Sequence, residues 1–76
     1  MDKNVKMAKV ITMTVELDNE LILKLVATVA PHVTPEMALC ISRQHGRIVK
    51  STETLAMPLP SALAHSFEQQ RKLGII

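Results

Sequence analysis

The alternation of apolar and polar side chains between residues 10 and 17 most constrains the fold of this chain. Apolar side chains occupy every second position, at Ile11, Met13, Val15 and Leu17. Polar side chains occupy the positions between them, at Thr12, Thr14 and Glu16. This period is typical of a strand with one buried face, because successive strand side chains point to opposite sides. We therefore expect a strand over residues 10–17 whose polar residues face outward.

The period changes at Asp18, where we expect a helix to begin. Asp is a favourable N-cap because its carboxylate accepts hydrogen bonds from the unpaired N–H groups of the first helical turn. Pro31 would end this helix at about Ala30. The apolar residues in between are spaced for one face of a helix, at Leu21, Ile22, Leu25, Val26 and Val29. The pattern predicts a helix over residues 19–30.

A second helix start is encoded in Thr34-Pro35-Glu36. The Thr can cap the helix, Pro fits the first helical position, and Glu complements the positive end of the helix dipole. We expect the helix to begin at Pro35, with Gly46 as a plausible stop.

The remainder of the chain is less regular. Residues 47–57 do not alternate cleanly and predict an irregular connector or a short strand. Ser61 can cap a last helix that runs to about Leu73. The expected organisation is a strand-helix-helix unit over residues 1–50, followed by a connector and a C-terminal helical tail over residues 51–76.

The composition argues against an enzyme. Cys40 is the single cysteine, which excludes an intramolecular disulfide, and its spacing from His32 and His45 does not match a metal site. With Gly46 and Gly74 as the only glycines, no phosphate-binding glycine loop can form. We expect no catalytic residue, no metal and no cofactor, with Cys40 as a small core residue.

Hydropathy and charge also restrict location and partners. No apolar run reaches the roughly 18 residues needed to cross a bilayer, and the polar start MDKNVKMAK lacks the apolar region of a signal peptide. We therefore expect a cytoplasmic protein without a membrane partner. The net charge of +2 does not by itself demand a nucleic-acid partner. The basic residues Arg43, Arg47 and Lys50 could form a phosphate patch, or could be a cluster favoured by the end of a helix dipole.

Residues 8–46 run from VITMTVELDNELILKL through PHVT to PEMALCISR, as strand, helix, turn and helix. This order resembles the ribbon-helix-helix family of DNA-binding proteins. In that family two chains pair their single strands into an antiparallel ribbon, and the outward side chains of the ribbon enter the major groove. The resemblance implies an α+β fold and a homodimer. A partner strand would also satisfy the backbone groups that a lone strand leaves unpaired.

The resemblance further implies a site on double-stranded DNA. The residues that it places against the bases are Thr12, Thr14 and Glu16. The start of the second helix near Thr34 would bind a phosphate through backbone N–H groups, and Lys9 would lie along the DNA backbone. Arg43 and Arg47 complete the expected set. The implied function is a small transcriptional regulator, such as a repressor.

Two alternatives remain open. The predicted helices over residues 19–30 and 35–45 could form a helix-turn-helix, with Arg43, His45 and Arg47 on the recognition side and residues 47–57 as a wing. The chain could instead be a non-enzymatic adaptor or inhibitor that binds a protein through its paired strands or its C-terminal tail. The negative charge of Glu16 and the low net charge favour this second alternative.

Overall fold

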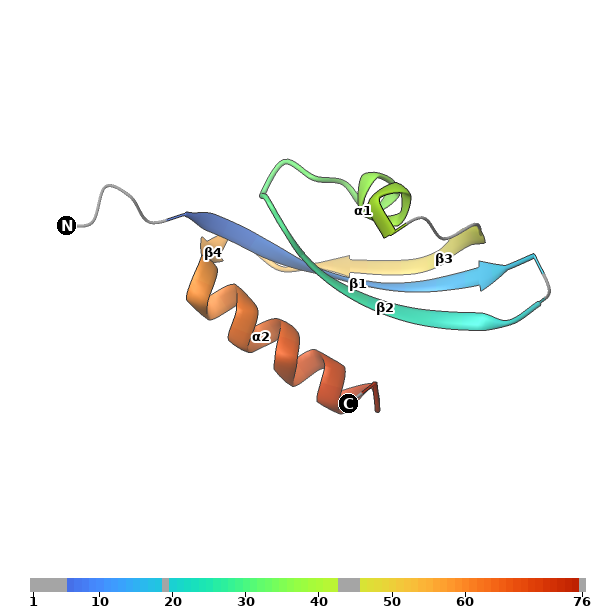
Figure 1. Ribbon diagram of the computed structural model, residues 1–76. Coiled ribbons are helices and arrows are strands. Elements are labelled where there is room, and N and C mark those ends of the chain that lie inside the picture. The colour runs from blue at the N-terminus through green and yellow to red at the C-terminus, as the bar shows by residue number, and fades with distance from the viewer. Residues whose placement is uncertain (1–5, 19, 43–45, 76) are drawn as a thin grey trace.

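The computed structural model describes residues 6–18, 20–42 and 46–75 (Figure 1). Its elements follow in the order β1 (Met7–Leu17), β2 (Ile22–Val29), α1 (Pro35–Ser42), β3 (Gly46–Glu53), β4 (Met57–Pro58) and α2 (Leu59–Lys72). Within these ranges the strands form a four-stranded antiparallel sheet in the order β2-β1-β3, with β4 also paired to β1. The expected fold of one strand followed by two helices and a helical tail is therefore wrong.

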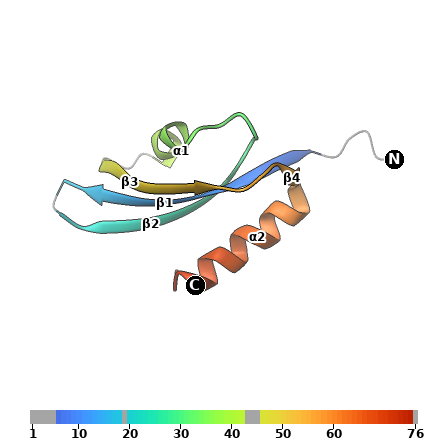
Figure 2. The same cartoon turned by 180° about the vertical axis from the view of Figure 1, so that it is seen from behind.

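Strand β1 is the centre of the sheet; its α1 side is buried along most of its length, whereas its α2 side is buried only toward the N-terminal end. Toward α1 it contributes Ile11, Met13 and Val15, which pack with Val33 and Ala38. Toward α2, its Ala8 and Val10 pack against Ala62. The two helices cover opposite faces, and α2 diverges from the sheet toward its C-terminal end (Figures 1 and 2). The predicted strand over residues 10–17 is confirmed, and it begins earlier than expected because its N-terminal end is covered by α2.

The predicted helix over residues 19–30 is wrong, since Ile22–Val29 form strand β2. Its apolar residues are spaced for a helix face, but Leu23, Leu25 and Ala27 also recur at every second position. These residues lie opposite Val15, Met13 and Ile11 of β1. Pairing with β1 therefore gives the segment a half-buried face and satisfies backbone groups along one edge, which outweighs the local helical pattern.

A tight turn joins β1 to β2 where the helix start was expected. The Leu17 N–H donates to the Leu21 carbonyl at 2.8 Å, and the Glu20 N–H donates to the Leu17 carbonyl at 2.9 Å. Glu20 has a φ of 67°, in the left-handed region that turns require. Asp18 thus belongs to a hairpin turn and does not cap a helix.

The start of α1 at Pro35 is confirmed. The Met37 N–H donates to the Thr34 hydroxyl at 3.2 Å, and the Ala38 N–H donates to the Thr34 carbonyl at 3.0 Å. Gly46 is the first residue of β3, and the expected helix end just before it falls on residues 43–45, outside the described ranges. The helix-turn-helix alternative is excluded, because its first helix is the strand β2.

Beyond α1, the short-strand interpretation of residues 47–57 is the correct one. Strand β3 pairs with β1 and carries an irregularity between Thr14 and Val15, so that Val49 has no residue opposite it. Helix α2 begins at Leu59 and not after Ser61, and its first position is preceded by Pro58 with no side-chain capping bond. The boundary expected between residues 50 and 51 lies inside β3. In the described part of the chain, no helix has the length and apolarity to cross a membrane.

Candidate anion-binding face

The face of the sheet on the α2 side has an open part lined by hydroxyl and ammonium groups. We call this the open face and define it by Thr12, Thr14, Lys24, Lys50 and Thr52. The strand register aligns these residues in rows, because Thr14 lies opposite both Lys24 on β2 and Lys50 on β3. Thr12 lies opposite Thr52 in the next row. A lysine therefore flanks a central threonine on each side, with the two lysine backbones roughly 10 Å apart.

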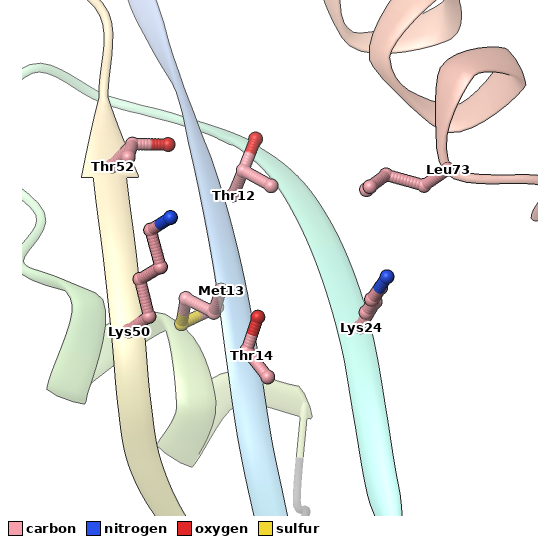
Figure 3. A pocket seen from close by; sticks show the side chains of 7 residues that line it. All are labelled: Thr12, Met13, Thr14, Lys24, Lys50, Thr52 and Leu73. Atoms are coloured by element: carbon pink, nitrogen blue, oxygen red, sulfur yellow. The ribbon is translucent and has the colours of Figure 1, made fainter.

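These residues line a hollow of about 240 Å³ between the sheet and the end of α2 (Figure 3). Leu73, just after α2, borders the hollow on the β2 side, and Met13 of β1 contributes to its floor. The three threonine hydroxyls and the two lysines come from three different strands, so the sheet holds them in a fixed arrangement. Hydroxyl donors and ammonium groups on one surface suit an anionic ligand.

Ion pairs in the described ranges leave the lysines of the open face available. Neither Lys24 nor Lys50 has a carboxylate within ion-pair distance among those residues. Glu16, one row further along β1, is paired with Arg47 of β3, with Oε1 and Nη2 3.1 Å apart. The negative charge of Glu16 is thus offset by its own neighbour, and no described carboxylate offsets the positive charge of Lys24 and Lys50.

The structure brings together only part of the residue set expected from the sequence. Thr12 and Thr14 share the open face, with Glu16 and Arg47 beside it. Lys9 forms an ion pair with Glu53, and both residues occupy strand positions whose side chains are on the α1 side of the sheet. Thr34 caps α1. Helix α1 lies on the opposite side of the sheet from α2 and the open face (Figure 2). Arg43 lies outside the described residues.

Three residues of the open face were missed as site residues: Lys24, Lys50 and Thr52. Lys24 falls within the predicted helix over residues 19–30, and Lys50 within the basic cluster with Arg43 and Arg47. A strand reading of ILKLVATV would have placed Lys24 on one face with Ile22 and Val26. The side-by-side placement of both lysines with Thr14 requires the register of two strand pairs, which the sequence pattern does not specify.

Cys40 and the histidines form no cluster in the described ranges. Cys40 is exposed, so the prediction that it lies in the core is wrong. His32 is exposed and His65 is half-buried on α2, whereas His45 lies outside the described residues. Within the parts of the chain that the structure describes, no three side chains of metal-binding type come together.

Comparison of the chain with protein families, with characterised proteins and with solved structures finds no match.

Proposed function

We propose that this protein binds nucleic acid through the open face, with double-stranded DNA as its ligand and a small transcriptional regulator as its role. The observation that carries the proposal is the row Lys24–Thr14–Lys50, in which two ammonium groups without an ion-pair partner among residues 6–18, 20–42 and 46–75 flank a hydroxyl donor. Phosphate oxygens are acceptors only and carry negative charge, so they match both kinds of group. The proposal retains the cytoplasmic location expected from the sequence.

The shape of the open face favours an extended polyanion over a small enclosed ligand. The hollow is bounded by Leu73 on one side, and the Glu16–Arg47 pair lies one row beyond it along β1, on the same face of the sheet. Lys24 and Lys50 would contact phosphates of the backbone, while Thr12, Thr14 and Thr52 would donate or accept hydrogen bonds at phosphates or base edges. The pairing of Glu16 with Arg47 reduces the repulsion that an isolated carboxylate would exert on a phosphate.

A salt titration of binding to a mixed-sequence DNA duplex tests this proposal. Each phosphate contact made by a cation contributes about −0.9 to the slope of log K against log salt, because counterions are released from DNA. The double variant Lys24→Ala/Lys50→Ala should weaken binding and reduce the magnitude of that slope by about 1.8. Fluorescence anisotropy with a labelled duplex measures both quantities.

The matched control is Lys6→Ala/Lys72→Ala, which removes the same charge from two exposed lysines outside the open face. This control should retain the slope of the natural protein. An unchanged slope in the Lys24/Lys50 variant would show that the open face is not the DNA interface.

A protein-binding adaptor is the second candidate function, and one observation favours it. Helix α1 exposes Met37 and Ile41, one turn apart, with 44% and 69% of their surfaces accessible. Two apolar side chains at this spacing suit contact with another protein more than with water. The salt titration separates the two candidates, because an adaptor would not bind the duplex even at low salt.

A further inference from the structure

The outer edge of β2 bonds to no other strand in the described ranges. The edge is eight residues long and its only charged side chain is Lys24. Long apolar edges are uncommon in natural sheets, because their unpaired backbone groups attract further strands.

The opposite edge of the sheet, β3, has the features that normally prevent such pairing. Strand β3 carries Arg47, Lys50 and Glu53, and its ladder is interrupted at Val49. Charged side chains and bulges both discourage pairing at an edge. The ladder of β2 is regular from Ile22 to Val29 and contains neither a bulge nor a proline. Strand β3 therefore has the features of an edge protected against pairing, whereas β2 has the features of an edge that pairs with another strand.

The hydrogen bonds of the hairpin indicate which backbone groups point outward from β2. The Leu17 N–H donates to the Leu21 carbonyl, which sets the odd-numbered residues of β1 and β2 as the bonded pairs. Val10, an even-numbered residue of β1, supports this assignment because both of its backbone groups point away from β2. Its N–H donates to the Thr54 hydroxyl, and its carbonyl accepts from the Thr54 N–H. The N–H and carbonyl groups of the even-numbered residues Ile22, Lys24, Val26 and Thr28 consequently point away from β1.

We propose that β2 pairs antiparallel with β2 of a second copy of this chain, which forms one continuous sheet across a two-fold axis. Opposed residues of an antiparallel pair share a face, so the axis must pass through a residue position and not between two residues. An axis at Lys24 would oppose two like charges. An axis at Leu25 opposes Lys24 to Val26 of the second copy, and an axis at Val26 opposes it to Thr28.

Apolar side chains on both faces of β2 favour a second copy as the occupant. Leu23 and Leu25 face the α1 side, while Ile22 and Val26 face the α2 side. A two-fold axis perpendicular to the sheet places the apolar side chains of each face beside apolar side chains on the same face of the second copy. The two copies therefore complement each other on both faces of the sheet. Helix α2 packs beside this strand and exposes Leu63 and Phe67, with 53% and 58% of their surfaces accessible. A small core also gains from oligomerisation, because a short chain buries little apolar surface alone.

The two-fold axis of such a pair is perpendicular to the sheet, so the open faces of both copies lie on the same side. If the proposed function holds, the dimer presents Lys24 and Lys50 twice on one continuous surface. The pairing itself does not depend on that function, and its test contains no nucleic acid.

The test compares Lys24→Pro with Lys24→Ala by sedimentation equilibrium over a range of concentrations. Proline removes the outward N–H of residue 24 but no bond to β1, whereas alanine removes the same side chain and keeps the N–H. The natural protein and Lys24→Ala should both dimerise. Lys24→Pro should dimerise at least about tenfold more weakly, because the dimer loses two symmetric hydrogen bonds. A natural protein that stays monomeric, or a proline variant that dimerises as tightly as the alanine variant, would overturn the proposal.

Amide hydrogen exchange on the natural protein gives an answer even if Lys24→Pro does not fold. The amides of Lys24, Val26 and Thr28 should exchange more slowly at high than at low protein concentration. The amides of Leu23 and Leu25, which bond to β1, should be protected at both. Rapid exchange of the even-numbered amides at every concentration would contradict the pairing.

Discussion

Gly46 begins β3 at a position where a side chain would not fit. A Cβ atom built there would lie 2.6 Å from the Glu16 carbonyl oxygen and 2.8 Å from Cγ1 of Val15. Both of these atoms belong to the central strand, which is held on two sides and cannot easily move. The sequence pattern predicts Gly46 as the end of a helix. In the structure, a glycine is required at this position because β3 approaches β1 too closely for a side chain.

The variant Gly46→Ala should destabilise the fold by about 1–3 kcal/mol, since the added methyl group overlaps packed backbone and side-chain atoms. Urea denaturation followed by circular dichroism measures the change. Gly74→Ala is the matched control, because its Cβ meets no atom within 4 Å and only its φ of +77° is unfavourable. An equal or larger loss in Gly74→Ala would argue against the steric reason given for Gly46.

At the scale of elements, the sequence predicts β1 and the start of α1 correctly and assigns β2 wrongly. The β1 alternation and the Thr34-Pro35-Glu36 signal each have one local interpretation. The apolar residues of β2 instead fit two structures, one face of a helix or a strand with apolar side chains on both faces. Ile22 and Val26, for example, are four residues apart, which suits one helix face and also one strand face. Contacts with β1 decide between the two, and these contacts are not encoded within the segment.

Thr34→Ala tests the helix start at Pro35, which the sequence predicts correctly. The Thr34 hydroxyl accepts a hydrogen bond from the Met37 N–H, and alanine would leave that donor without its capping partner. The free energy of unfolding should fall by about 1 kcal/mol, whereas Thr34→Ser keeps the hydroxyl and should lose much less. Thermal and urea unfolding of the three proteins provide the comparison, and equal losses in both variants would mean that the hydroxyl does not cap α1.

At the scale of the whole molecule, the candidate site depends on three strands that meet only in the folded chain. Alternation along β1 correctly places Thr12 and Thr14 on one face, so this part of the site was predictable. Lys24 and Lys50 join them only through the β1–β2 and β1–β3 registers, and the sequence pattern predicts a helix where β2 lies. Because Ile22–Val29 form a strand paired with β1, Lys24 lies on the same face as Thr14 and Lys50.

The most direct test of the open face as the DNA interface is an NMR titration of the labelled protein with a short DNA duplex at low salt. Chemical-shift changes are expected at the residues of the open face, Thr12, Thr14, Lys24, Lys50 and Thr52. Residues of α1, on the opposite face of the sheet, should change little. Shift changes confined to α1, or no change at any residue, would contradict the account.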